Sequence, residues 1–385
     1  MAPSVTSDGG VEISMMRPDN VHQITSRLFQ DPSGHELPER YHWPDYDRVD
    51  LWAPAEDGQE SVPVIDLTGL ASGDPEVIDR LTREVGQATE EWGFFQVVNH
   101  GVPDEVCAAM RKAGMSFLDK PVELKERATD PVGNYYGYGG RYERLKSRVP
   151  WMEFLAANRT PACEADRIRL TIWPDGDPVG NAFRDSVMEY SSCLQTLSMQ
   201  ILQLLARNLG LPEDYYVKFF QDSTKFDSSW RFNRYPPCPP QAVTFGIGPH
   251  SDPSVLVMLQ QDEVGGLQVL KGDTWHSVNP IPGAIIVNVG DSLEAWTNGR
   301  YESAVHQVLL TEKKKWRLSV IYALNPPSNI LVSAPEELVD DKHPRKFRDF
   351  AWPDYIHNMR SNRHRIRDKV ALDFVTIGAK NRWEE

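Results

Sequence analysis

The chain has 385 residues, of which 40% are hydrophobic and 25% charged, which excludes a collagen-like, low-complexity or wholly disordered protein. Its net charge of −14 argues against a nucleic-acid partner, because phosphates would be repelled. A folded domain of this size buries roughly three quarters of its unfolded surface, so a bound metal would serve chemistry rather than stability.

Two further features bear on where the protein works. No apolar stretch is long enough for a membrane helix, and the N-terminus does not resemble a secretion signal. The four cysteines are widely spaced and form no metal-binding or disulfide pattern. We therefore expect reduced thiols in a cytoplasmic protein without a membrane partner.

The first 165 residues divide into an irregular segment and a mixed module. Residues 1–60 are rich in Pro, Asp, Gly and Ser, and we expect a mobile, irregular segment there. Residues 61–165 combine apolar strand runs with amphipathic helix patterns and form a predicted N-terminal module. Its predicted elements are a strand at 62–67, a helix that begins at Asp74-Pro75, a buried strand within 92–101 and a helix after Pro103-Asp104.

The longest predicted helix spans 181–209. A coiled coil shows the same heptad spacing, but three heptads between Gly180 and Gly210 are too short for one. We therefore expect a core helix against a sheet, within a helical framework over 166–226. Its apolar stripe steps by four and three positions through Phe183, Val187, Tyr190, Leu194, Leu197, Ile201 and Leu204.

Short β-rich runs follow one another after residue 227, separated by Gly, Pro, Asn or Asp. Eight such runs predict a two-sheet sandwich or jelly roll over 227–335, and a charged helical tail follows over 336–385. Because helices dominate the first half, the predicted class is α+β, with strands of the roll taken from both halves. The runs are SWRFNRY, VTFGIG, SVLVMLQQ, GLQVL, WHSVNP, AIIVNVG, SAVHQVLL and WRLSVIYAL.

His250-Ser251-Asp252 places two metal-ligand types two residues apart, at the start of the SVLVMLQQ run. Side chains at i and i+2 of a strand point to the same face, so both can bind one metal. His306 lies 306 − 252 = 54 residues further on and offers a third ligand. Two imidazoles and one carboxylate form the facial triad of non-haem Fe(II) oxygenases, but zinc accepts the same ligands. The triad predicts a metal site without deciding the metal.

Arg317-Leu318-Ser319 again places two polar side chains on one face of a strand. An arginine on an otherwise apolar strand needs a partner, because an unpaired buried charge is very costly. That partner is either an internal Asp or Glu in a structural ion pair, or the carboxylate of a ligand, with Ser319 as a second donor.

RFNRYPPCP contains a third polar set on one strand face. Arg231, Asn233 and Tyr235 alternate with their neighbours, and Pro236 and Pro237 end the strand. Each of these residues alone is ordinary on a surface strand. Three polar sets within one β-rich half, however, indicate a shared cavity.

In these motifs the chain resembles the plant-type 2-oxoglutarate- and Fe(II)-dependent dioxygenases, which include flavonoid, gibberellin and jasmonate oxidases. WGFFQVVNHG is similar to the family's N-terminal motif, NRYPPCPP to its NYYPPCPQP stretch, HSD to its HxD and RLS to its RxS. GLQVLKGDTWHSVNP and VNVGDSLEAWTNGRYESAVH match in order and spacing, so the likeness spans roughly residues 60 to 335. The implied fold is a double-stranded β-helix, that is a jelly roll, backed by the long helix.

The resemblance also implies roles for the motif residues. In the family's reaction, 2-oxoglutarate and O2 give succinate and CO2 while the substrate is hydroxylated, dealkylated or desaturated, and ascorbate is the expected reductant. Fe(II) and one carboxylate sum to +1 and the cosubstrate is a dianion, so one arginine brings the charge to zero. The implied Fe(II) ligands are His250, Asp252 and His306, and the implied 2-oxoglutarate residues are Arg317, Ser319, Asn233 and Tyr235.

Four positions bear on the substrate. Flavonoid-oxidising members commonly place a stacking aromatic six residues after the RxS arginine, where this chain has Ala323, and Phe154 matches another pocket aromatic. Related enzymes have a basic residue at the position of Arg231, and we hypothesise that it binds an acidic or phenolic group, with a structural salt bridge as the alternative. Tyr138, in GNYYGYGG, is expected in a flexible loop over the mouth, although the same composition describes an ordinary loop.

Hydroxylation of a small organic metabolite by a monomeric enzyme is therefore the predicted function. An ascorbate-using oxidase of the same fold that does not need 2-oxoglutarate keeps an RxS pair as well, so it stays an alternative. A non-catalytic small-molecule receptor on this scaffold is a second alternative, although all three ligands are present. A nucleic-acid demethylase is disfavoured by the net charge of −14.

Overall fold

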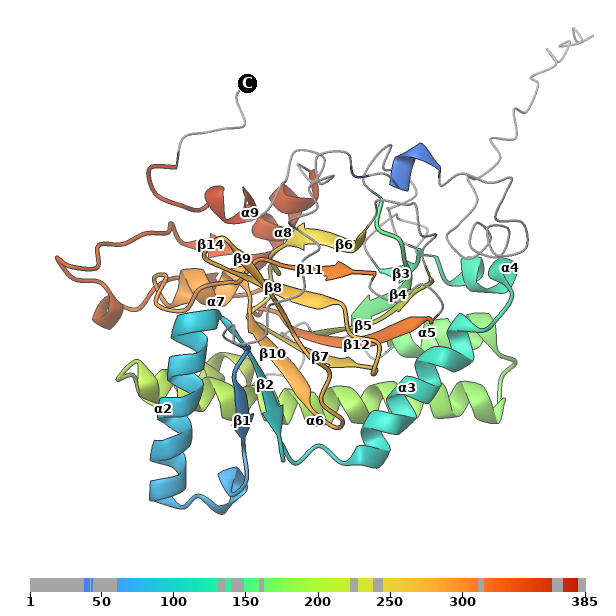
Figure 1. The fold of residues 1–385 in the computed structure, drawn as a ribbon, viewed down its shortest axis with the longest axis horizontal. Helices are drawn as coiled ribbons and strands as arrows, with labels where there is room; N and C mark the ends of the chain where they lie inside the picture. Colours follow the sequence, from blue (N-terminus) through green and yellow to red (C-terminus); the bar gives the residue numbers. More distant parts are fainter. Residues whose placement is uncertain are drawn as a thin grey trace, which may run out of the picture.

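The computed structural model describes ten segments of the chain, and strands from both of its halves build one large sheet (Figure 1). Most of the expected irregular segment over 1–60 lies outside these residues. No helix in the described part is long and apolar enough to cross a membrane. The described residues are 38–41, 43, 61–129, 136–139, 149–158, 163–221, 228–237, 245–310, 315–361 and 370–379.

The elements are as follows. The α-helices are α2 (Pro75–Trp92), α3 (Asp104–Leu118), α4 (Val122–Lys125), α5 (Cys163–Ile172), α6 (Pro178–Asn208), α7 (Asp291–Trp296), α8 (Trp352–Ser361) and α9 (Val370–Asp373). The strands are β1 (Val64–Asp66), β2 (Phe94–Val98), β3 (Gly137–Tyr138), β4 (Glu153–Asn158), β5 (Ser228–Tyr235), β6 (Phe245–His250), β7 (Leu256–Gln261), β8 (Leu267–Lys271), β9 (Thr274–Ser277), β10 (Ile285–Val289), β11 (His306–Leu309), β12 (Arg317–Leu324), β13 (Leu331–Val332) and β14 (Phe350–Ala351).

Two sheets form the predicted roll. The larger has the order β1-β2-β10-β7-β12-β5-β4-β3, and the smaller has the order β6-β11-β8-β9. All eight runs expected after residue 227 are strands, and β1 to β4 of the first half join the larger sheet. The predictions of an α+β class and of a roll built from both halves are confirmed. The division into five segments stays a prediction.

Helix α2 follows from local signals in the sequence at both of its ends. The side chain of Asp74 accepts a hydrogen bond from the backbone N–H of Glu76 and caps α2, whose first residue is a proline. Gly93 ends α2 at φ 59°, in the left-handed region that favours glycine. A side chain at this position would also clash, because a Cβ would lie 2.0 Å from the Glu302 carbonyl oxygen.

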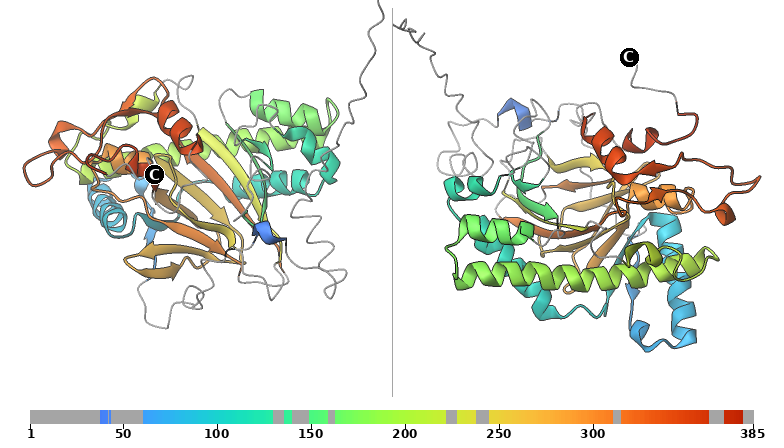
Figure 2. Two further views of the ribbon diagram at one scale, coloured as in Figure 1. Left: turned by 90° about the horizontal axis from the view of Figure 1, so that it is seen from above. Right: turned by 180° about the vertical axis from the view of Figure 1, so that it is seen from behind.

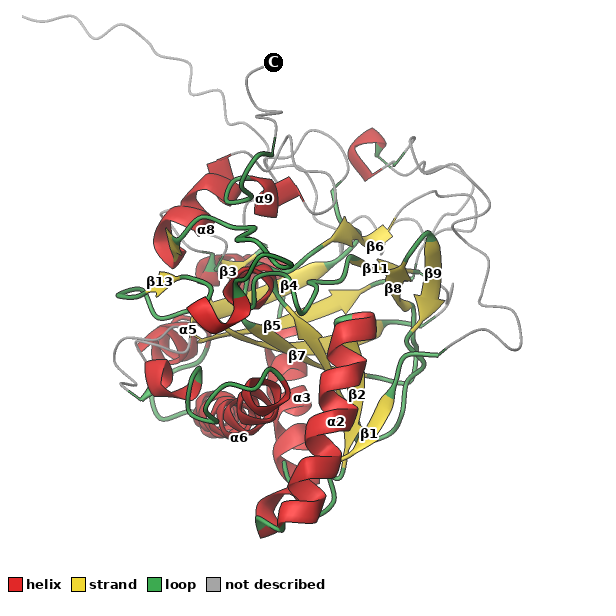
Figure 3. Ribbon diagram, turned by 90° about the vertical axis from the view of Figure 1, so that its left-hand side faces the viewer, coloured by secondary structure: helices red, strands yellow, loops and turns green. Residues whose placement is uncertain are grey.

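Helix α6 crosses the larger sheet on one face, as the view from behind in Figure 2 and the end-on view in Figure 3 show. Its predicted apolar stripe is buried against that sheet. The helix begins three residues earlier than expected, because Asp177 caps it by accepting from Val179 and Gly180 N–H. Gly180 is therefore inside the helix, where a Cβ would lie 2.8 Å from Trp173 Cβ. This glycine permits close packing and does not mark the helix end.

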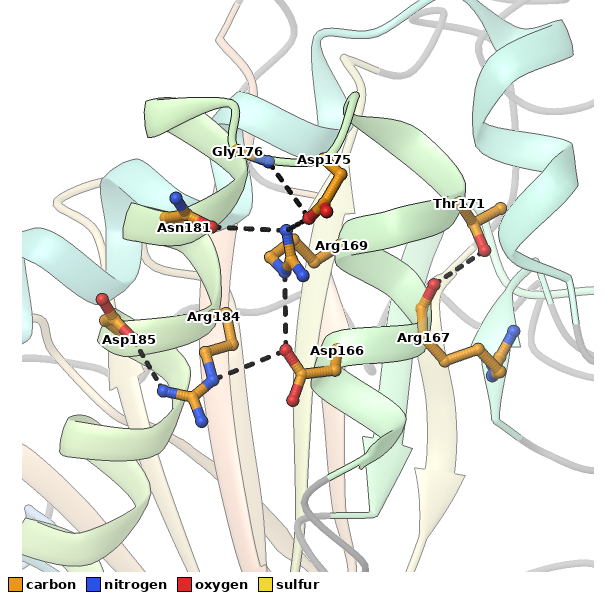
Figure 4. A network of polar contacts seen from close by, with 9 residues as sticks. All are labelled: Asp166, Arg167, Arg169, Thr171, Asp175, Gly176, Asn181, Arg184 and Asp185. Atoms are coloured by element: carbon orange, nitrogen blue, oxygen red, sulfur yellow. Dashed lines mark hydrogen bonds and ion pairs between the residues drawn. The ribbon is translucent and has the colours of Figure 1, made fainter.

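Helices α5 and α6 are joined by a network of ion pairs on their outer side (Figure 4). Arg169 lies 3.4 Å from Asp166 and 3.2 Å from Asp175, and Arg184 lies 3.6 Å from Asp166. Most of these groups are partly exposed to solvent, so each pair contributes little to stability. The network orients the two helices and lies away from the roll.

The tail beyond residue 336 is only partly helical. Helices α8 and α9 are present, and α8 contains the predicted YIHNMR helix, but β14 pairs with β13 in a small separate sheet. Cys107 and Cys193 are free thiols, in agreement with the expectation of reduced cysteines for the part of the chain that is described.

Candidate active site

Three possible metal ligands meet between the smaller sheet and the connection that follows β6. His250 ends β6 and His306 begins β11, and the two residues are register partners. Asp252 lies in the connection to β7 and not on a strand, so the expectation of one shared strand face was wrong. The two Nε2 atoms lie 3.8 Å and 3.5 Å from the Asp252 carboxylate, and all three ligand atoms lie within 4.8 Å of one another.

Backbone carbonyls orient both imidazoles. Nδ1 of His250 lies 2.9 Å from the Gly248 oxygen, and Nδ1 of His306 lies 3.1 Å from the Ala304 oxygen. A carbonyl only accepts, so each Nδ1 carries the proton and each Nε2 lone pair faces the space between the ligands. Such partners behind the ligands are typical of metal sites.

Asp252 is oriented by a side chain that the sequence analysis did not single out. Asn288, on β10, donates from Nδ2 to Asp252 Oδ2 at 2.9 Å. Asn288 is the only polar residue of β10. A single asparagine in an otherwise apolar strand was the sequence signal that could have indicated its role. Burial, reinforced by His306, lowers the pKa of His250 to about 4. Burial alone would raise the pKa of Asp252, but the two histidines hold it below its usual value. His250 and Asp252 are thus unprotonated at neutral pH, as metal binding requires.

Arg317 and Ser319 lie on the face of β12 that points away from the helices, and both are buried. The arginine donates from Nε to the Gly265 oxygen at 2.6 Å and from Nη2 to Gln261 Oε1 at 3.1 Å. Within the described residues Arg317 makes no ion pair. The expected alternative of a structural ion pair with an internal Asp or Glu is therefore not seen there. The Arg317 Nη1 and the Ser319 Oγ are buried without a hydrogen-bond partner among those residues. Two unsatisfied donors side by side fit an anionic ligand.

The polar residues of β5 form a chain of hydrogen bonds along the strand, as their alternation predicts. Arg231 Nε donates to Asn233 Oδ1 at 2.5 Å, and Asn233 Nδ2 donates to Tyr235 Oη at 3.1 Å. Tyr235 is the register partner of Arg317, whose Cζ lies 4.9 Å from the tyrosine ring centre. The two polar sets therefore share one face of the larger sheet.

Phe154 lies on the same face, on the neighbouring strand β4 opposite Asn233. Its ring is buried, and the Arg231 Cζ lies 4.0 Å above its centre. Ala323, four residues after Ser319 on β12, has the same orientation and adds only a methyl group.

Tyr138 is not in a mouth loop, and that expectation was wrong. It lies in β3, is buried, and its hydroxyl donates to Glu153 Oε2 at 2.9 Å on the helix-facing side of the sheet. The neighbouring Tyr136 packs instead against the apolar cluster that contains Phe154. Tyr136 precedes β3, so strand alternation does not place it on the same face as Tyr138.

Two family models match the chain: "2OG-Fe(II) oxygenase superfamily" over residues 226–326, and "non-haem dioxygenase in morphine synthesis N-terminal" over residues 62–176. Gibberellin 20 oxidase 1-B of Triticum aestivum is 37% identical over 323 residues, which are 82% of this chain and 85% of that protein. The chain belongs to the 2-oxoglutarate- and Fe(II)-dependent oxygenases. Gibberellin 20 oxidase 3 of Arabidopsis thaliana is 35% identical to this oxygenase over 357 residues, which are 90% of each chain.

Solved structures agree with this family. JOX2 in complex with 2OG, Fe and JA is 30% identical to this oxygenase, with a TM-score of 0.76 over 93% of this chain and 97% of that one. A rice dioxygenase for auxin oxidation is 31% identical, with a TM-score of 0.68 over 82% of this chain and 100% of that one. The jelly-roll fold and the dependence on Fe(II) and 2-oxoglutarate are thus confirmed.

The residues of this oxygenase fit the two groups that the family uses. The pair of imidazoles and the carboxylate form an oxygen and nitrogen donor set suited to Fe(II), and the unsatisfied donors of Arg317 and Ser319 suit a carboxylate. Bound iron supplies the oxygen chemistry that turns 2-oxoglutarate into succinate and CO2 and oxidises the substrate. The chain itself contributes three ligands that its own hydrogen bonds orient, and buried donors that orient a dianion.

Proposed function

We propose that this oxygenase hydroxylates a small organic metabolite that carries an acidic or phenolic group. The gibberellin and auxin names of its relatives concern small hormones, and we take from them only that size and class. Within this proposal the iron ligands are His250, Asp252 and His306, the distal carboxylate of 2-oxoglutarate is held by Arg317 and Ser319, and Asn233 and Tyr235 support the cosubstrate.

The charges of the site support this assignment. Fe(II) with one carboxylate ligand carries +1, and 2-oxoglutarate carries −2, so the buried Arg317 makes the loaded site neutral. Neutrality matters because an uncompensated charge in a buried site is very costly.

Arg231 is a further cation on the same strand face as Asn233, and its position carries the proposal. It is half-buried on β5, and its guanidinium lies over Phe154 at 4.0 Å. Its charge also contributes to the lowered pKa of His250 and of Asp252, so it acts within the space that the metal ligands face. A planar guanidinium above an aromatic ring is suited to grip a carboxylate or a phenolate of a flat or compact substrate.

The test is succinate formation with Fe(II), ascorbate and 2-oxoglutarate, screened with small acids, phenols and the neutral amide of each acid. We expect one acid or phenol to stimulate oxygen-dependent succinate release and its neutral analogue to do so poorly. Arg231→Gln should raise KM for that acid about tenfold or more, as loss of a hydrogen bond to a charged group predicts, and leave KM for the amide unchanged. Arg184→Gln, on the outer side of α6, is the control.

Equal KM values of the parent and Arg231→Gln enzymes for the acid would refute the role of Arg231. Absence of succinate with every compound, despite tight Fe(II) binding, would favour the oxidase that does not use 2-oxoglutarate. We also propose that the protein is a monomer of the cytoplasm, and the free thiols of Cys107 and Cys193 support that location.

A further inference from the structure

Helix α8, in the tail beyond residue 336, sends the side chain of Tyr355 into the interior. Tyr355 is 1% exposed, and its hydroxyl donates to Asp291 Oδ2 at 2.8 Å. Asp291 is itself 1% exposed, and its other oxygen, Oδ1, has no hydrogen-bond partner among the described residues. The tyrosine hydroxyl is therefore the main donor that fixes this carboxylate.

Asp291 begins α7 and is bonded through its backbone to a proposed iron ligand. Its N–H donates to the carbonyl oxygen of Asp252 at 2.7 Å. The next residue, Ser292, donates from its N–H to the Ser254 oxygen at 3.2 Å and from its hydroxyl to the Pro253 oxygen at 2.6 Å. The start of α7 thus holds the whole Asp252 turn, which we define as residues 252–255.

Close packing leaves this junction little freedom. Gly290 N–H donates to the Val255 oxygen at 3.1 Å, and a Cβ on Gly290 would lie 2.1 Å from the Ser254 oxygen. Real Cβ atoms do not approach a backbone oxygen so closely, so the two backbones are in direct contact. A displacement of Asp291 is consequently passed on to the Asp252 turn.

We propose that Tyr355 is a positioning residue of the metal site, which sets the orientation of Asp252 through Asp291. This inference rests on the proposed function, because it takes Asp252 as an iron ligand. Tyr355 also lies beyond residues 226–326, where the oxygenase model matches. The metal site would thus extend to a helix outside that region.

A purely structural role for Tyr355 makes a different prediction. In that case the lost hydrogen bond lowers the stability of the fold but leaves the folded protein with its normal affinity for iron. A positioning role lowers both, because a misdirected carboxylate binds the metal less well. Fe(II) affinity of the folded protein therefore separates the two.

The experiment is anaerobic equilibrium dialysis of the full chain against Fe(II), together with thermal unfolding. We expect Tyr355→Phe to raise the Kd for Fe(II) about tenfold, the lower end of the loss found when partners of metal ligands are changed. The matched control is Tyr301→Phe, since Tyr301 is equally buried and its hydroxyl bonds the Leu205 oxygen and Asn208 on the helix side. Tyr301→Phe should lower Tm and keep the parent's Kd. A Tyr355→Phe protein with the parent's Kd would overturn the proposal.

A second pair of variants tests the link from its other end, in case Tyr355→Phe does not fold. The asparagine of Asp291→Asn still accepts a hydrogen bond from the Tyr355 hydroxyl, so this variant should keep most of the Fe(II) affinity. Asp291→Ala removes the acceptor and should raise the Kd for Fe(II) about tenfold. Equal Kd values for the two variants would overturn the proposal. Asp252→Ala separates this outcome from a failure of the proposed function. If Asp252→Ala binds Fe(II) like the parent, the proposed metal site is wrong. If it loses Fe(II) while Tyr355→Phe does not, only the role of Tyr355 is wrong.

Discussion

Glu153→Gln should strongly destabilise the protein, because Glu153 is the central anion of a buried ionic cluster behind the active-site strands. Its carboxylate is 3% exposed and accepts from Lys125 Nζ at 2.8 Å, Tyr138 Oη at 2.9 Å and Arg234 Nε at 2.6 Å. Both cations are buried as well, and the further partner of Arg234, Asp119, is 61% exposed. The cluster joins the end of α3 and α4 to the β4–β5 pair.

The expected loss of stability follows from the buried donors that Glu153→Gln leaves without a partner. Glutamine keeps one acceptor oxygen, so at least one of the three donors loses its partner, and two buried cations face each other without their shared anion. Breaking a buried ion pair by removing one partner costs about 3–5 kcal/mol, and we expect a loss of about 3 kcal/mol in the free energy of unfolding. With a urea m-value of about 3 kcal/mol/M, the midpoint should fall by about 1 M.

The same prediction has a pH dependence of fixed sign. Burial would raise the pKa of Glu153, but Lys125 and Arg234 together hold it below its ordinary value. A lowered folded-state pKa stabilises the fold above the unfolded value and loses that contribution as the pH falls through the folded value. The difference between parent and variant should therefore be full at pH 7 and shrink in acid, below the ordinary range of glutamate.

Urea unfolding at pH 7 and at successively lower pH measures both effects. Glu123→Gln, an exposed glutamate on α4, is the control and should change stability by less than about 0.5 kcal/mol. A Glu153→Gln difference below about 1 kcal/mol at pH 7, or one that stays constant with pH, would refute the reasoning.

Two further predictions concern the cosubstrate and the backbone. Arg317→Met should weaken 2-oxoglutarate binding by about 2 kcal/mol or more, roughly thirtyfold, in calorimetry of the metal-loaded protein, and an unchanged Kd would contradict its proposed role. Gly93→Ala should lower the free energy of unfolding by about 2 kcal/mol or more, because the alanine Cβ meets the Glu302 oxygen at positive φ. Gly73→Ala, also at positive φ but with nothing within 4 Å, should cost only about 1 kcal/mol in the same thermal unfolding assay; equal losses would rule out the clash.

Local signals made the elements predictable, but not all of their bounds. Asp74-Pro75 predicts the start of α2 because a capping carboxylate and a proline at the first position act within one turn. The start of α6 was misjudged because Gly180 reads as an end signal unless its contact with Trp173 is known. The pairing of β2 with β10 also depends on contacts far apart in the sequence.

In the site, too, residues within one motif were predictable, whereas contacts between distant segments were not. The HSD motif and His306 named three residues whose ligand atoms the fold brings together, and RLS named two buried donors on one strand, since each motif fixes its own residue types. The buried cluster of Lys125, Glu153 and Arg234 was not foreseen, because single charged residues are usually exposed and only the fold reveals that they meet. For the same reason the link from Tyr355 on α8 to the Asp252 turn could not be predicted from the sequence.

The pairing of β2 with β10 also has a consequence for biosynthesis. Val97 pairs with Ile285, so 285 − 97 = 188 residues must be made before this edge of β2 can close. At about 5–20 residues per second, roughly 10–40 s of translation pass with that edge open. Phe94, Phe95 and Val97 are almost completely buried in the finished protein. The nascent chain therefore carries an apolar strand with an unpaired edge for about half of its 385-residue synthesis, which is the kind of segment that chaperones protect from aggregation.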